Sequence, residues 1–133
     1  SKRIPRGVVC LLSALAYHDI GTQLPSVVWL AIDQRSRPLV TTDLPAKIVR
    51  FSAQSLVEGV EEHSVEGVTV RITNPAKTVA DCFKFRNKVG LDIALEALRD
   101  AWRKRKVTMV ELDRFAATNR MTNVMRPYLE MLT

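Results

Sequence analysis

One segment, residues 73–90, constrains the fold more than any other part of the chain. It reads Thr-Asn-Pro-Ala-Lys-Thr-Val-Ala-Asp-Cys-Phe-Lys-Phe-Arg-Asn-Lys-Val-Gly. Asn74 is a suitable N-cap, because its side-chain oxygen can accept a hydrogen bond from an amide of the first turn. Pro75 follows at the first helical position, where its missing N–H costs nothing, and Gly90 supplies the stop. The segment therefore predicts a helix with defined ends.

The spacing of side chains in this segment predicts a helix that is packed on more than one side. At about 100° per residue, apolar positions cover a wide arc. One stripe along the helix contains Ala76, Val79, Ala80 and Phe83. A second stripe beside it contains Thr78, Cys82, Phe85 and Val89. The remaining face holds Lys77, Asp81, Lys84 and Lys88. We expect a central helix whose Asp81 forms ordinary surface ion pairs with Lys77 and Lys84.

The rest of the chain predicts an α+β fold with strands and helices segregated along the sequence. We expect a buried helix at residues 8–18, strands at 27–32 and 48–52, and a hairpin at 57–72 that turns at Glu66 and Gly67. After the central segment, helices are predicted at 91–104, at 108–119 behind a Thr108–Glu111 capping box, and at the C-terminal end. The expected architecture is an N-terminal helix, a small, mostly antiparallel or mixed sheet of about four strands, and four helices packed on it. Residues 1–7 are expected to be a linker or arm, and residues 8–133 a single domain.

Several segments in the same order resemble one protein family. The clearest is 74–84, followed by 86–92; further matches lie at 10–15, 23–25, 28–32 and 123–130. Together they are similar to the C-terminal domain of AbiEi-type antitoxins, which are transcriptional regulators of bacterial type IV toxin–antitoxin (abortive infection) systems. The resemblance covers nearly the whole chain.

This resemblance implies a non-enzymatic regulatory domain that counteracts a nucleotidyltransferase-like toxin and supports repression of its operon. Such proteins bind operator DNA through an N-terminal winged helix-turn-helix, and none can be read in these 133 residues. We therefore expect either a domain excised from a longer protein or a natural short form. Direct contact with the toxin and formation of a homodimer are left open. No cofactor is implied.

Composition sets further bounds on location and partners. The formal net charge of +6 suits a nucleic acid or an acidic protein, but many soluble proteins carry as much. Two cysteines, Cys10 and Cys82, lie among apolar residues and are expected to be buried free thiols. No apolar run approaches the roughly 20 residues that span a bilayer, so we expect no membrane contact. With so few cysteines and no export signal, we expect a cytoplasmic protein.

Two groups of polar residues are candidates for a binding role. The candidate partner-binding residues are Arg71, Lys77, Lys84, Arg86, Asn87 and Arg126. The candidate basic patch, near the end of the helix at 91–104, consists of Arg99, Arg103, Lys104, Arg105 and Lys106. The ordinary interpretation of the first group is a set of hydrogen bonds that tie helix ends together. The ordinary interpretation of the second is a solvated helix C-terminus, where positive charge is favourable; its functional role would be contact with phosphates or an acidic protein.

Catalytic patterns are weak in this sequence. The carboxylate and lysine set of a metal-dependent nuclease could be formed by Glu61 or Glu62 with Asp81 and Lys84. The alternative function is therefore a nuclease-like domain or a domain that binds nucleic acid through its basic surface. The two histidines, His18 and His63, are too far apart in sequence to predict a zinc site.

Overall fold

The computed structural model describes residues 7–35 and 45–132, so the arm predicted at residues 1–7 lies almost wholly outside the described residues. The strands are β1 (Val8–Val9), β2 (Val28–Asp33), β3 (Ala46–Phe51), β4 (Val60–Val65) and β5 (Val68–Thr73). The helices are α1 (Leu11–Tyr17), α2 (Pro75–Lys84), α3 (Arg86–Val89), α4 (Leu91–Arg103), α5 (Met109–Thr118) and α6 (Thr122–Glu130). The fold is α+β, as the sequence predicts. No helix in the described part of the chain combines the length and apolar character that crossing a bilayer requires.

The described strands form one mixed sheet in the order β3-β2-β1-β5-β4. The predicted hairpin is antiparallel β4–β5, and its register runs from the Val60–Thr73 pair to the Val65–Val68 pair. Strand β2 pairs in parallel with β3 and antiparallel with β1. The two-residue strand β1 then pairs in parallel with β5 and so joins the two halves of the sheet.

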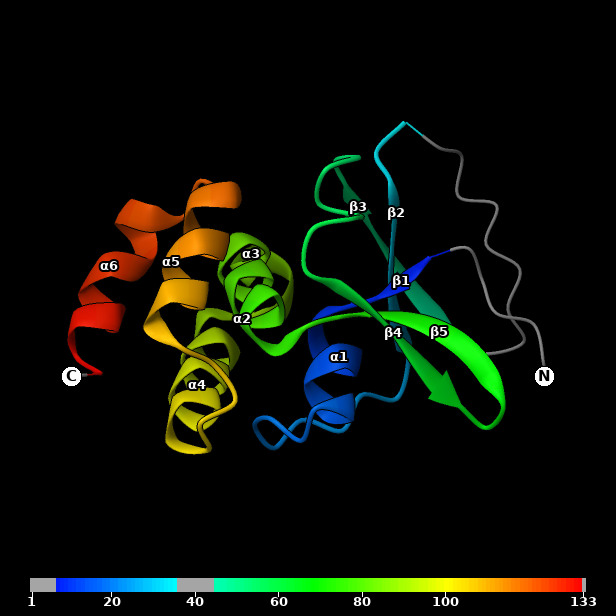
Figure 1. Cartoon of the computed structure of the whole chain (residues 1–133), viewed down its shortest axis with the longest axis horizontal. Coiled ribbons are helices and arrows are strands. Elements are labelled where there is room, and N and C mark those ends of the chain that lie inside the picture. The colour runs from blue at the N-terminus through cyan, green and yellow to red at the C-terminus, as the bar shows by residue number, and fades with distance from the viewer. Residues whose placement is uncertain (1–6, 36–44, 133) are drawn as a thin grey trace.

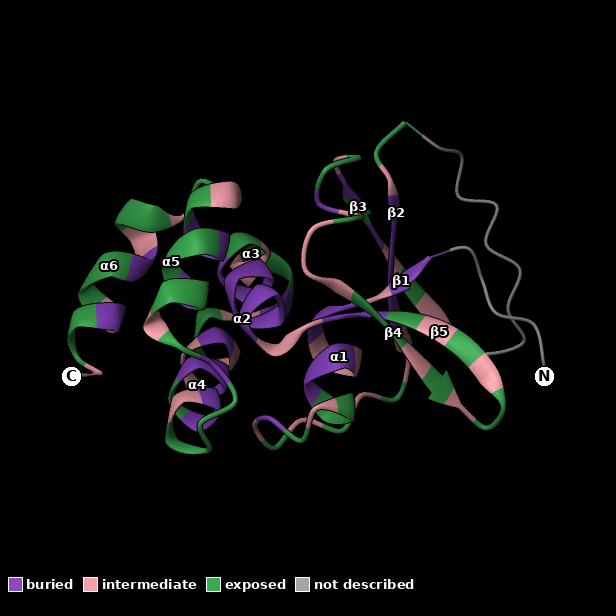
Figure 2. Cartoon of the chain, in the orientation of Figure 1, coloured by how far each residue is buried: buried purple, intermediate pink, exposed green. Residues whose placement is uncertain are grey.

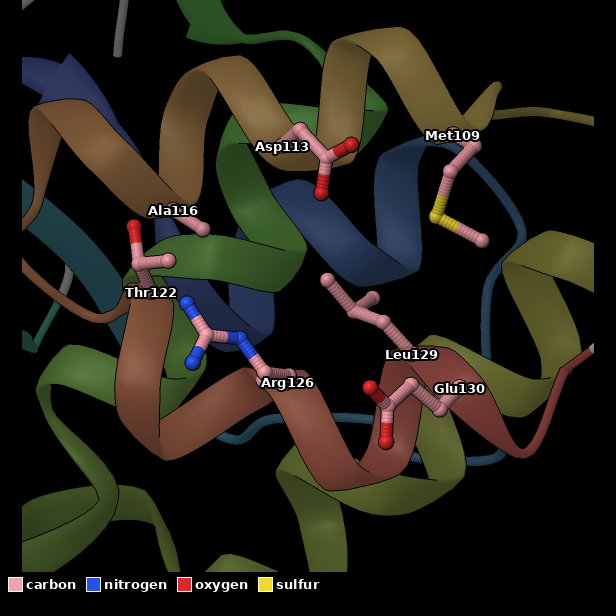
Figure 3. Close-up of a pocket in the computed structure, with 7 residues that line it drawn as sticks. All are labelled: Met109, Asp113, Ala116, Thr122, Arg126, Leu129 and Glu130. Carbon is pink, nitrogen blue, oxygen red and sulfur yellow. The ribbon is translucent and has the colours of Figure 1, made fainter.

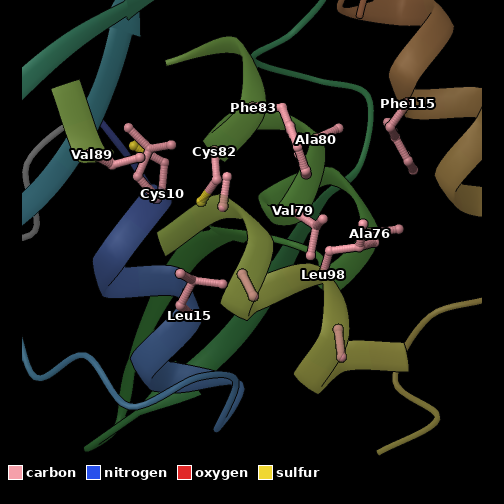
Figure 4. Packing of buried hydrophobic residues seen from close by; sticks show 14 of the residues in the cluster. Cys10, Leu15, Ala76, Val79, Ala80, Cys82, Phe83, Val89, Leu98 and Phe115 are labelled. Carbon is pink, nitrogen blue, oxygen red and sulfur yellow. The ribbon is translucent and has the colours of Figure 1, made fainter. Parts of the chain in front are cut away.

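Helix α2 lies between the sheet with α1 on one side and helices α4 and α5 on the other (Figure 1). It packs against α1 on the side of the sheet and against α4 and α5 on the other side. Its residues Val79, Ala80 and Phe83 are completely buried in the hydrophobic core cluster, seen in Figure 4. Strand residues such as Trp29 and Phe51 belong to the same cluster. The prediction of a central helix packed on several sides is confirmed.

The local signals at the helix ends are also confirmed. The side chain of Asn74 accepts a hydrogen bond from the Lys77 N–H at 2.8 Å, and Pro75 begins α2. The capping box of α5 is complete, because the Thr108 hydroxyl accepts from the Glu111 N–H while the Glu111 carboxylate accepts from the Thr108 N–H. These interactions satisfy amides that a helix leaves without intrahelical partners.

Three predicted details are wrong. Residues 8–9 form a strand rather than the start of a helix, and their β-branched side chains suit the sheet into which β1 inserts. The helix predicted over 74–90 is broken at Phe85, whose ring stacks on that of Phe51 at 5.7 Å between centroids. The C-terminal helices pack mainly around α2 and one another, whereas α1 packs on β2.

Candidate functional site

The polar face predicted for the central helix is in fact partly interior. Lys77 and Asp81 are each 0% exposed, and α2 appears as an almost continuously buried segment in Figure 2. The Lys77 Nζ lies 3.6 Å from Asp81 Oδ1 and donates a hydrogen bond of 2.7 Å to Ser55 Oγ. The same ammonium group lies 4.9 Å from the centre of the Phe51 ring. The prediction that Lys77 and Asp81 form a surface ion pair is wrong.

Asp81 extends this buried network to the C-terminal end of α5. The amide Nδ2 of Asn119, also buried, donates to Asp81 Oδ1 at 2.8 Å. The second carboxylate oxygen, Oδ2, has no hydrogen-bond partner in the described part of the chain. Burial raises the pKa of Asp81, although Lys77 and Asn119 act in the opposite direction. This buried network therefore connects the loop between β3 and β4, which contains Ser55, with α2 and with the end of α5.

The chain folds over this network at Gly59. This residue has φ +74°, and a Cβ placed on it would come within 2.8 Å of Lys77 Cδ and 2.7 Å of the Phe115 ring. The Gly59 carbonyl also accepts from the Asn74 N–H, so the loop before β4 is fixed directly above α2. Only a residue without a side chain allows this close approach.

The buried network contains groups used elsewhere in nucleophilic catalysis, but solvent does not reach them. Ser–Lys hydrolases also pair a serine with a lysine, but there a neutral lysine amine accepts the serine proton, whereas here Lys77 Nζ donates to Ser55 Oγ. Here Ser55 is 4% exposed and Lys77 is fully enclosed. The neighbouring thiols of Cys10 and Cys82 are free and buried, as predicted, and burial raises the pKa of both. The geometry therefore makes this network a structural element of the core.

Two histidines that are distant in sequence meet at the junction of α1 and β4. The ring centroids of His18 and His63 lie 5.9 Å apart, with the Tyr17 ring against both. His18 Nε2 donates to the Thr73 carbonyl at 2.8 Å, and burial lowers its pKa. His63 contacts Glu61 at 2.8 Å. Among the described residues, no three His, Cys, Asp or Glu side chains are grouped so as to hold a metal ion.

The candidate basic patch is partly neutralised by its own surroundings. Its members Arg99, Arg103 and Lys104 line a cleft of about 640 Å³ together with Gly21, Thr22, Glu96 and Asp100. Asp100 accepts from the Gly21 N–H at 2.7 Å and forms ion pairs with Arg103 and with Lys104. These contacts lower the pKa of Asp100 to about 2, the Gly21 hydrogen bond being the largest cause. The other two members, Arg105 and Lys106, are exposed in the loop that follows.

A groove between α5 and α6 contains Arg126 of the candidate partner-binding residues (Figure 3). Its volume is about 350 Å³. The lining residues are Met109, Asp113, Ala116, Thr122, Arg126, Leu129 and Glu130. The floor is apolar and the rim is charged. Sequence periodicity indicates the buried faces of these helices but does not show that their exposed neighbours enclose a groove.

The other candidate partner-binding residues are dispersed. Arg71 is exposed on β5 and donates to the Leu56 carbonyl at 2.6 Å. Arg86 joins the end of α2 to the start of α6, because its Nη1 donates to the Phe83 carbonyl and contacts Met121 Sδ. Lys84 is exposed at the end of α2.

Asn87 lies in a separate place, a pocket of about 390 Å³ beside Trp29, with Lys47, Ile48, Val49 and Lys88 as the other lining residues. The structure therefore does not unite the candidate partner-binding residues in one surface. It also separates the residues of the nuclease alternative, because Asp81 is enclosed while Glu61 and Glu62 are exposed on β4.

In comparisons with known proteins, no protein-family model and no curated protein matches this chain. The residues and their geometry therefore carry the functional argument.

Proposed function

We propose that the chain is a non-enzymatic regulatory domain of a bacterial type IV antitoxin and transcriptional regulator. In this proposal it acts in the cytoplasm, counteracts a nucleotidyltransferase-like toxin and supports repression of the operon, while a winged helix-turn-helix outside these residues binds operator DNA. The resemblance at 74–84 supplies the family. The chain acts through its surfaces and carries out no chemical step.

The observation that carries this proposal is the enclosure of Lys77 and Asp81. They are two of the ionisable residues of the most distinctive matching segment, and both are 0% exposed, whereas Lys84 at its end is exposed. A side chain that solvent does not reach cannot contact a substrate or a partner. Their hydrogen bonds to Ser55 and Asn119 instead hold the sheet loop, α2 and α5 together. The matching segment thus supports an architecture shared with the antitoxin family. We infer that residues of the exposed grooves carry the regulatory function.

A growth-rescue assay tests the proposal. The chain is expressed with the toxin encoded beside it, alone and fused to any upstream residues of its gene. We expect rescue of growth by the chain alone or by the fused form. Rescue by neither form, with both proteins shown to be soluble, would overturn the proposal.

Structure-guided variants make this assay specific. Lys84→Ala and Asn87→Ala alter exposed residues and leave the core intact, whereas Arg86→Ala removes contacts with α2 and α6. A loss of rescue caused by Arg86→Ala alone, with lowered thermal stability, would indicate a structural role. A loss caused by Lys84→Ala or Asn87→Ala at unchanged stability would identify a surface that the toxin pathway requires.

The cleft at α4 supports a second candidate function, contact with nucleic-acid phosphates. Arg99 lines this cleft, and Arg105 and Lys106 are exposed nearby. Phosphate binding weakens by roughly 10³-fold between about 50 and 200 mM salt when about six contacts form. Here Asp100 already pairs with two of the cations, so we expect a smaller salt dependence. Binding of DNA or RNA that is unchanged by Arg99→Glu and by added salt would exclude this function.

A further inference from the structure

The groove between α5 and α6 carries charges for which the described residues provide no partner. In the described part of the chain, no ion pair or side-chain hydrogen bond engages Asp113, Arg126 or Glu130. In Figure 3, the Arg126 side chain extends from α6 toward Thr122, and Asp113 points from α5 on the other side of the groove. One cation and two carboxylates thus surround an apolar floor and remain available to an occupant.

The surface beside this groove carries a large exposed apolar side chain. Val110 is 79% exposed, although most apolar residues of α5 are buried or half-buried. At about 100° per residue, Val110 and the exposed Ala117 lie on the helix face that adjoins Asp113. The exposed Val110 side chain therefore lies beside the apolar floor of the groove, with Asp113 between the two.

We propose that the groove between α5 and α6 is a self-association surface that receives a second copy of this chain. In a two-fold contact, each residue that meets a partner residue is met by the same residue in return. Val110 of each copy enters the groove of the other, and Arg126 of each copy pairs with the partner's Asp113. The two helix pairs pack as four helices, in the manner of a bundle.

Charge complementarity selects a second copy over other occupants. The chain as a whole carries a formal charge of +6, which opposes self-association. The groove is a local exception, because Asp113 and Glu130 outnumber Arg126. The patch therefore contains both members of the ion pair that a two-fold contact requires. A purely acidic partner would leave Asp113 and Glu130 facing like charge, and a purely basic partner would leave Arg126 facing like charge, whereas a second copy provides an opposite charge for both Arg126 and Asp113.

A charge-swap experiment tests the proposal. Sedimentation equilibrium on the chain from about 5 µM to about 1 mM covers the range expected of a small interface. We expect a monomer–dimer equilibrium whose dissociation constant rises at least tenfold in Arg126→Glu and in Asp113→Arg, because each places like charges opposite one another. The double variant restores the opposite charges and should return to within about threefold of the wild-type value.

Two further variants test whether a weaker dimer results from a changed contact surface, from a loss of folding or from a change in net charge. Val110→Asp changes an exposed residue in the first turn of α5, where an acidic residue is favourable to the helix; it should weaken the dimer at least tenfold with an unchanged unfolding midpoint. Lys88→Glu makes the same change of charge as Arg126→Glu at an exposed position of α3 and should leave the dimer unaffected.

The proposal fails if the chain is monomeric over the whole concentration range, if Arg126→Glu and Val110→Asp leave the dimer intact, or if the double variant does not recover. None of these measurements involves the toxin, so their outcome is independent of the proposed antitoxin function.

Discussion

At the scale of single residues, the buried pair of Lys77 and Asp81 is the most consequential feature. Removing two charges from water costs several kcal/mol per ion, and the mutual attraction repays this only when the remaining polar atoms are satisfied. Ser55 and Asn119 satisfy part of that need, but Asp81 Oδ2 remains without a described partner. The pair therefore makes the core sensitive to the loss of either member.

A double-mutant cycle on this pair gives a first prediction. Lys77→Met leaves the Asp81 carboxylate buried alone, and Asp81→Asn leaves the Lys77 ammonium alone. Each should lower the free energy of unfolding by about 3–5 kcal/mol in urea titrations. The double variant removes both charges and should lose clearly less than the sum of the single losses. Additive losses would mean that the two groups do not interact.

Gly59 and Gly67 provide a matched pair for a second prediction. Both have positive φ, at +74° and +81°, but a Cβ on Gly67 would meet nothing within 4 Å. Gly67→Ala should therefore cost only the backbone term of about 1 kcal/mol. Gly59→Ala adds a clash with Phe115 and Lys77 and should cost about 2–4 kcal/mol in the same titration. An equal loss of the free energy of unfolding in the two variants would show that the loop containing Gly59 shifts to accommodate the methyl group.

At the scale of elements, Asp100 fixes the C-terminal part of α4 against the turn that follows α1. Its carboxylate accepts the Gly21 N–H and pairs with Lys104, which itself donates to the Asp19 carbonyl at 2.9 Å. One carboxylate therefore positions two elements that are distant in sequence. The candidate basic patch is consequently a mixed-charge surface.

The lowered pKa of Asp100 gives a prediction with a defined sign. A folded-state pKa of about 2, against about 3.9 in the unfolded chain, means that the ionised group stabilises the fold above about pH 4. This contribution is lost as pH falls from about 4 to about 2. Asp100→Asn should therefore destabilise the protein at pH 7, by about 1 kcal/mol allowing for solvent screening. The difference from wild type should vanish near pH 2; a difference that persists there would contradict the assigned pKa.

Sequence reasoning is most successful for elements with strong local signals. Asn74 with Pro75, and Thr108 with Glu111, determine helix starts through contacts within one turn, so neighbouring residues suffice to predict them. Lys77 shows the limit of this reasoning. Its spacing places it opposite an apolar stripe, but the loop at Gly59 and the ring of Phe51 cover that face too, and both come from distant segments.

The candidate site shows the same dependence on long-range contacts. The cleft that contains Arg99 includes Gly21 and Thr22 from the segment after α1. The histidine cluster forms because the pairing of β4 with β5 brings His63 to the end of α1. No local pattern specifies which distant segments meet. The sequence therefore indicates which residues are charged or titratable, but not which residues from distant segments lie next to them.

At the scale of the whole molecule, α2 is the connection between its two parts. The sheet and α1 lie on one side of it, and α4 and α5 on the other (Figure 1). Phe83, which is fully buried, contacts the Tyr128 ring of α6 at 5.8 Å between centroids. Neither part has a complete core without this helix, so we expect one cooperative unfolding transition.

Native-state hydrogen exchange checks this expectation. Amides in the centre of α2, such as those of Val79 and Ala80, should exchange only through global unfolding, at the free energy measured by urea titration. Amides near the turn at Glu66 and Gly67 should exchange through local opening at much lower free energy. Exchange of α2 at a free energy well below the global value would show that the two parts unfold separately.

The position of α2 in the sequence also has a consequence during synthesis. The helix begins at Pro75, after every strand has been made. The Phe51 ring at the end of β3 therefore leaves the ribosome before Lys77 of α2 and Phe85, which pack against it. At about 5–20 residues per second, the interval from the end of β3 to the end of α2 is roughly 2–7 s. During those seconds the Phe51 ring and the face of α1 that packs on α2 are exposed, so chaperone binding to this chain should be concentrated on ribosomes that have not yet released α2.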